Sequence, residues 1–88
     1  MELDPTTMKP VINRIKRAQG QLAGVLRLLE EGRDCEDVVT QLAAVSKALD
    51  RAGFAIVAAG LQQCLVDNDG DAESLDVKKM EKLFLSLA

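Results

Sequence analysis

The chain has 88 residues, which is enough for one small domain. Its formal net charge of −3 argues against a generally basic nucleic-acid binder. Two phenylalanines are its only aromatic residues, and leucine, alanine and valine dominate, which favours a helical bundle. Histidine is absent, which excludes Ser/His/Asp and Cys/His nucleophilic sites and the common Cys/His zinc sites. No phosphate loop or dinucleotide fingerprint occurs either. We therefore expect a protein that is not an enzyme.

The sequence also carries no signal for export or membrane insertion. No uncharged apolar run reaches the roughly 18 residues that a transmembrane helix needs. The first four residues are acidic at two positions and lack the basic and apolar regions of a signal peptide. We therefore expect a cytoplasmic protein without a membrane partner. In that reducing compartment two cysteines are more often reactive or metal-binding than joined in a structural disulfide.

The N-terminal part predicts a flexible arm followed by a helix. Residues 1–8 form the expected arm, because Pro5 opposes an early regular helix. Residues 9–88 form the expected single helical domain. The first helix begins between Thr7 and Pro10 and ends at Glu31, just before a glycine suited to a left-handed conformation. A G-x-x-x-G pattern on this helix predicts close packing against a neighbouring helix.

Two further helices are expected after it. The second spans Asp34–Leu65, with Asp34 as its N-cap. Its segment Ala52–Leu61 contains no charged residue, and a helix that is apolar on nearly every side is buried on nearly every side. A monomer of this size cannot cover such a helix, so we infer an oligomer. A polar turn at 67–71 leads to the third helix, Glu73–Leu87, which completes an all-α protomer.

One cysteine lies near each end of the second helix. At about 1.5 Å per residue, Cys35 and Cys64 would be roughly 43 Å apart along the axis. They therefore cannot meet within one continuous helix. An antiparallel pair of these helices would bring Cys35 of one chain beside Cys64 of the other, and would create two identical sites per dimer. Two unrelated buried thiols remain the alternative.

The positions of these two thiols also predict different reactivities. Cys35 lies in the first helical turn, where the helix dipole favours the thiolate, although neighbouring carboxylates oppose this effect. Cys64 lies in the last turn, where the dipole disfavours the thiolate. The asymmetry suggests an attacking thiol at Cys35 and a resolving thiol at Cys64, with two passive thiols as the alternative.

Basic residues form two groups at helical spacing. Arg14 and Arg17 share one face of the first helix, with Lys16 beside them, and Lys47 and Arg51 lie one turn apart on the second. Each group is suited to phosphate contacts or, alternatively, forms a solvated face. A tetramer would repeat these charges enough for salt-dependent binding to double-stranded DNA.

Two segments resemble the copper- and nickel-sensing repressors of the CsoR/RcnR type. NRIKRAQGQLAG, residues 13–24, resembles that family's R-L-x-R-I-x-G-Q-x-x-G signature, and CEDVVTQLAAV, residues 35–45, resembles its C-x-D-V-x-x-Q-[LI]-x-A-[VA] segment. The resemblance implies a three-helix protomer, an antiparallel homodimer with a four-helix-bundle-like core, and a disc-shaped dimer-of-dimers homotetramer. It also implies bacterial transcriptional repression at operator DNA without a helix-turn-helix.

The resemblance also bears on what is sensed. Copper members bind Cu(I) through Cys, His and Cys across the dimer; here Cys35 and Cys64 match the cysteines, but the histidine position is Gly60. Nickel members need several histidines, and formaldehyde members use an N-terminal proline where this chain has Glu2. The remaining likeness is to the persulfide-sensing branch, which links two cysteines across protomers.

The protein is therefore predicted to be a cytoplasmic repressor that senses reactive sulfur species through Cys35 and Cys64. Sensing would derepress genes of sulfide and sulfur metabolism. No cofactor is expected in that reading. A Cu(I)-responsive repressor using the same two cysteines is the first alternative. A helical interaction module that does not bind DNA is the second.

Overall fold

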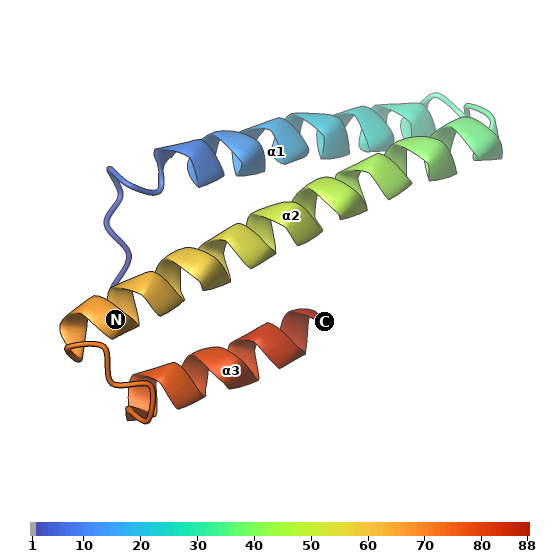
Figure 1. Ribbon diagram of the computed structural model, residues 1–88. Coiled ribbons are helices and arrows are strands. Elements are labelled where there is room, and N and C mark those ends of the chain that lie inside the picture. Colours follow the sequence, from blue (N-terminus) through green and yellow to red (C-terminus); the bar gives the residue numbers. More distant parts are fainter. Residues whose placement is uncertain (1) are drawn as a thin grey trace.

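The computed structural model describes residues 2–88 as three helices: α1 (Lys9–Glu30), α2 (Cys35–Asp67) and α3 (Leu75–Leu87) (Figure 1). No strand occurs within this described part of the chain. The expected all-α protomer with three helices of unequal length is confirmed. None of the helices in residues 2–88 is both long enough and apolar enough to cross a membrane.

Local capping explains where the helices begin and end. The Asp34 carboxylate accepts a hydrogen bond from the backbone N–H of Glu36 at 3.2 Å and starts α2 as predicted. Gly32, with φ of +66°, lies just beyond α1 in the left-handed conformation expected after a helix. Ser74 accepts from the N–H of Val77 at 3.3 Å, so α3 begins slightly later than the sequence pattern predicted. The second helix continues to Asp67, two residues beyond the predicted end.

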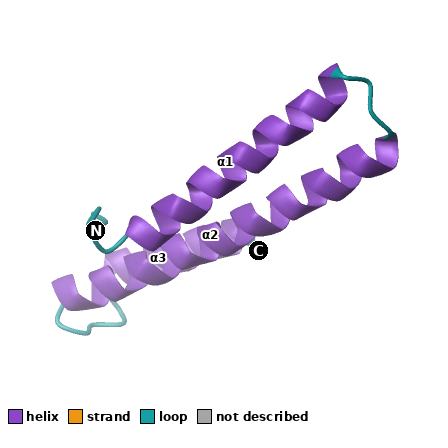
Figure 2. Ribbon diagram, turned by 90° about the horizontal axis from the view of Figure 1, so that it is seen from above, coloured by secondary structure: helices purple, strands orange, loops and turns teal. Residues whose placement is uncertain are grey.

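The long helix α2 packs against both other helices in a flat protomer. Helix α1 runs antiparallel to α2, and α3 folds back along the C-terminal half of α2 (Figures 1 and 2). Within residues 2–88, α1 and α3 each pack on α2 but not on each other. The extents of 54 × 26 × 13 Å describe an elongated layer little more than one helix thick.

This layer buries only a narrow set of side chains. In α2, Ala52 and Cys64 are fully buried, whereas Leu42 and Leu49 are 47% and 46% exposed. The aromatic rings of Phe54 and Phe84 pack with centroids 5.6 Å apart, yet both residues remain partly open to solvent. The apolar circumference predicted for α2 is therefore covered only in part by its own chain. Assembly into a dimer or tetramer stays a prediction.

The two glycines of the G-x-x-x-G pattern have different surroundings. Gly24 faces α2, where a side-chain carbon would collide with the Gln41 amide, and Gln41 donates a hydrogen bond to the backbone oxygen of Gln21 at 3.4 Å. Gly20 has no neighbour within 4 Å of the position that a Cβ would take. The prediction of close packing is therefore right for Gly24 and wrong for Gly20 within the protomer.

The segment before α1 contains local order. Asp4 anchors a turn: its carboxylate accepts from the N–H of Thr6 at 2.9 Å, and its backbone oxygen accepts from the N–H of Met8 at 3.0 Å. Met8 is only 7% exposed. Met1 lies outside the described residues, and the flexibility expected of residues 1–8 stays a prediction.

Candidate functional site

The structure separates Cys35 and Cys64 completely. Cys35 is the first residue of α2 and is exposed, whereas Cys64 lies in the last turns of the same helix and is fully buried. The helix between them is continuous, so the predicted separation of roughly 43 Å holds. One protomer does not bring the two thiols together. Any joint action needs a second chain.

Cys64 belongs to a small buried cluster between α2 and α3. Val77 and Met80 of α3 contact it, and Val57 and Leu65 of α2 pack around the cluster. This burial raises the pKa of the Cys64 thiol, and the negative charges of Asp76 and Asp67 raise it further. The raised pKa agrees with the direction expected from the end of a helix. Its main cause, however, is burial in the α2–α3 contact.

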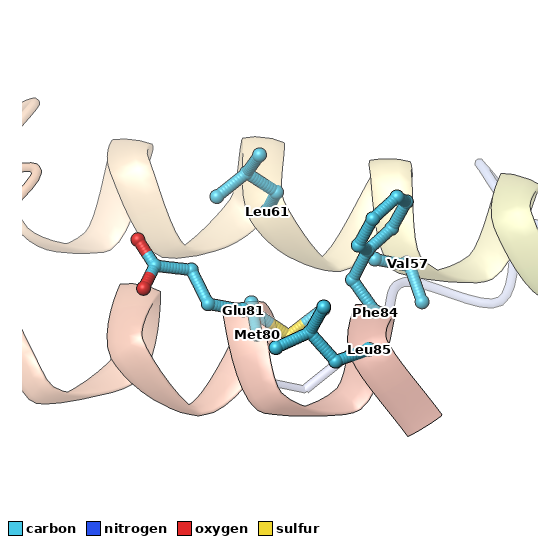
Figure 3. Close-up of a pocket in the computed structure, with 6 residues that line it drawn as sticks. All are labelled: Val57, Leu61, Met80, Glu81, Phe84 and Leu85. Carbon is cyan, nitrogen blue, oxygen red and sulfur yellow. The ribbon is translucent and has the colours of Figure 1, made fainter. Parts of the chain in front are cut away.

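Gly60, which stands where the resemblance implies a histidine, lies at the contact between α2 and α3. A Cβ on Gly60 would lie 2.9 Å from Cε and 3.3 Å from Sδ of Met80, so glycine allows this close approach. Figure 3 shows Met80 between the two helices, beside a hollow of about 370 Å³ that Val57 and Phe84 also line. A thioether therefore fills the space that a larger residue at position 60 would need.

The described residues of one protomer do not form a complete metal site by themselves. Among residues 2–88, no group of three or more Cys, Asp or Glu side chains is arranged to hold a metal ion. The two cysteines are soft donors of the kind that Cu(I) prefers. Because Cys64 is fully covered, a ligand from another chain can reach it only if side chains at the α2–α3 contact move.

Three of the five predicted DNA-contacting residues converge on one surface. Arg14 and Arg17 of α1 and Arg51 of α2 line a hollow of about 310 Å³, together with Gln21 and Ala48. Within residues 2–88, no ion pair joins any of these arginines to a carboxylate. We call this surface, formed by Arg14, Arg17, Gln21 and Arg51, the arginine hollow. Its charge and its unpaired guanidinium groups suit a phosphate.

The other two predicted residues lie elsewhere. Lys16 borders an apolar hollow of about 500 Å³ that Ile12, Ile15 and Ile56 also line. Lys47 is exposed on α2 and does not line the arginine hollow. The sequence interpretation missed Gln21, although it follows Arg17 by one helical turn and so shares its face.

Comparison with known proteins identifies relatives of the whole helical region. A family model described as a metal-sensitive transcriptional repressor matches residues 7–86. The copper-sensing transcriptional repressor CsoR of Mycobacterium ulcerans is 37% identical over 68 residues, covering 73% of this chain and 58% of its own length. CsoR of Bacillus subtilis is 32% identical over 76 residues, covering 78% of this chain and 75% of its own.

A third relative carries a different name. The copper-sensing transcriptional repressor RicR of Mycobacterium tuberculosis is 36% identical over 52 residues, covering 59% of this chain and 54% of the relative. The chain thus spans less than two thirds of the mycobacterial relatives. No solved structure matches significantly.

These matches confirm part of the sequence interpretation and correct another part. The resemblance to CsoR/RcnR-type repressors is confirmed, and a family of repressors agrees with the expectation of a protein that is not an enzyme. The relatives do not distinguish the persulfide-sensing branch. The expectation of no cofactor is wrong, because the matched repressors are copper sensors. That expectation rests on Gly60, which stands where the copper members have their histidine ligand.

Proposed function

The chain belongs to the family of metal-sensitive transcriptional repressors, and from this membership we propose that it is a Cu(I)-responsive, DNA-binding repressor of the bacterial cytoplasm. The observation that carries the proposal is the pair of cysteines at the two ends of α2, in a chain related to copper-sensing repressors. Thiolates are the ligands that select Cu(I) over harder metal ions.

The proposed operator contact is the arginine hollow. Arg14 and Arg17 approach a phosphate from α1, and Arg51 approaches the same phosphate region from α2. Guanidinium groups bind phosphate oxygens in a bidentate manner, and a homotetramer presents four copies of the hollow to double-stranded DNA. Lys16 and Lys47 lie outside the hollow and contribute, in this proposal, only to the surrounding positive potential.

The proposed metal site joins Cys35 of one protomer to Cys64 of another in an antiparallel dimer. When bound, Cu(I) supplies a soft centre that holds thiolates together. Side chains at the α2–α3 contact must move before Cys64 can accept the second chain, because Cys64 is fully buried in the protomer. Arg51 lies on the same helix as both cysteines. A change in how two α2 helices pair therefore moves the arginine hollows of the two protomers relative to each other, which would spoil their match to the DNA phosphates and weaken DNA binding.

The test combines Cu(I) titration with DNA binding. We expect one equivalent of Cu(I) per protomer to be bound with high affinity, and operator DNA to dissociate at the same stoichiometry in fluorescence anisotropy. The variants C35A and C64A should bind DNA normally and lose the response to Cu(I). Wild-type protein that fails to bind Cu(I) in competition with a chelator would refute the copper proposal.

A second candidate inducer is a reactive sulfur species. The observation that favours it is the absence of any histidine, with Gly60 where the resemblance expects a ligand. In this reading the Cys35 thiolate attacks a polysulfide and keeps its terminal sulfur as a persulfide, while the shortened polysulfide leaves. Cys64 of another protomer then attacks the inner sulfur of that persulfide, expels hydrosulfide and forms an interprotomer disulfide; a longer hydropolysulfide on Cys35 gives a trisulfide or tetrasulfide in the same way. The bridge then lowers the affinity for DNA. Mass spectrometry after polysulfide treatment should then give a covalent dimer. Protein that remains monomeric on a denaturing, non-reducing gel would leave copper as the inducer.

A further inference from the structure

The α2–α3 contact brings two sulfur-containing side chains into one buried cluster. Cys64 is fully buried and Met80 is 6% exposed, and the two belong to the same packed group. Met80 is the soft donor that the protomer already places beside Cys64. The other cysteine, Cys35, is at the far end of α2.

The geometry at position 60 directs both sulfurs toward the same space. Cys64 follows Gly60 by four residues, so their Cα–Cβ directions share one face of α2. Helical side chains lean toward the N-terminus, so the Cys64 side chain lies over the turn that contains Gly60. The Met80 Sδ lies 3.3 Å from the position that a Cβ on Gly60 would take. The thioether therefore occupies the face over which the thiol leans.

We propose that Met80 supplies a third, thioether ligand to the Cu(I) site, together with Cys64 of its own protomer and Cys35 of a second protomer. This inference rests on the proposed copper function. A thioether is a soft neutral donor that suits Cu(I), and methionine is flexible enough to turn its sulfur toward a nearby ion. The hollow of about 370 Å³ beside Met80 gives this side chain room to move (Figure 3).

The oxygen donors near Cys64 are less suitable. Asp67 and Asp76 are close enough to raise the pKa of the Cys64 thiol, but carboxylates suit Mg²⁺, Ca²⁺ and Mn²⁺ rather than Cu(I). A Met80 ligand also has a structural consequence. Because Met80 belongs to α3 and Cys64 to α2, a metal bound by both side chains would hold α3 in a defined position on α2. Copper binding would then affect both helices.

Selenomethionine labelling tests the proposal directly. Fully labelled protein loaded with one equivalent of Cu(I) should show a copper scatterer in X-ray absorption at the selenium edge. That signal should disappear in M80L, which keeps an apolar side chain of similar volume. The affinity for Cu(I) should also fall by about ten- to a hundredfold in M80L, the range found when the ligand surroundings of a metal are disturbed.

The matched control is M8L, because Met8 is equally buried, at 7% exposure, but lies at the start of α1. M8L should keep both the selenium–copper signal and the wild-type affinity. Copper bound with no scatterer at the selenium edge would overturn the Met80 proposal and leave a two-thiolate site. A selenium–copper signal that persists in M80L would also overturn the proposal, because another methionine would then be the ligand. Failure of the labelled wild-type protein to bind Cu(I) at all would instead refute the proposed function.

Discussion

The two ends of α2 carry one cysteine each and yet differ in nearly every other respect. At the Cys35 end, α2 is packed by α1 alone, and the thiol is exposed beside a capping carboxylate. At the Cys64 end, α3 covers the helix and buries the thiol completely. The difference is made by α3, which reaches only the C-terminal half of α2 (Figure 1). Similar residues at two ends of one helix therefore acquire different accessibility from their neighbours.

The two ends of α2 would therefore meet a second chain in different ways. The Cys35 end has exposed apolar side chains, such as Leu42 and Leu49, that can be covered by another chain without any change in the protomer. The Cys64 end must rearrange before it can meet a partner. In an antiparallel pair the middle of α2 meets its own copy, so we expect the region around Leu49 to carry the permanent interface and the Cys64 end to carry the metal-dependent change.

The largest expected effect is on assembly. The wild-type protein should be a homotetramer at micromolar concentration by light scattering. Replacing Leu49 with a charged residue, in L49E, should produce smaller species, because it places a carboxylate on the exposed apolar face of α2. K47E provides a charged control on an exposed polar position nearby. A wild-type protein that is a stable folded monomer would exclude a cross-chain cysteine site.

The second expected effect is on thiol reactivity in reduced, metal-free protein. Cys64 should react with an alkylating reagent roughly a hundredfold more slowly than Cys35, which corresponds to a local opening cost of about 3 kcal/mol. Peptide mass spectrometry over time measures both rates in one sample. V77A should speed the reaction at Cys64 alone, because it loosens the cover provided by α3. Equal rates at both cysteines would remove the proposed distinction between the two ends.

The third expected effect is on DNA binding. R14A and R51A should each weaken operator binding by about tenfold and lower the slope of log affinity against log salt by about one. R27A is the matched control, since Arg27 is an exposed arginine of α1 outside the arginine hollow. K16A should have a smaller effect than R14A. Equal losses for all four variants would indicate general electrostatic attraction rather than a specific phosphate site.

The smallest expected effect is on stability. G20A should raise the free energy of unfolding by about 0.5–1 kcal/mol, because alanine favours a helix and nothing lies within 4 Å of the added carbon. G60A should lose that gain, since its Cβ would lie 2.9 Å from the Met80 side chain. Denaturant unfolding of both variants measures the difference. A larger gain for G60A than for G20A would contradict the close α2–α3 contact.

The local features of this protein follow from its sequence alone. Helical periodicity, the Asp34 cap and Gly32 set the first two helices within a few residues, because the physical causes act within one or two turns. The separation of Cys35 and Cys64 also follows from helix rise alone. The alignment of Arg14 with Arg17 follows from helix periodicity.

Which distant residues meet depends on how the helices pack. The burial of Cys64 depends on α3, and the arrival of Arg51 beside Arg14 and Arg17 depends on how α1 packs on α2. Lys16 borders a different hollow, and only the packing of α1 on α2 shows that Ile56 lies across it; a role of Lys16 in DNA binding stays a prediction. The approach of Met80 to Gly60 likewise follows from the packing of α3 on α2, because no local pattern encodes a contact between two helices.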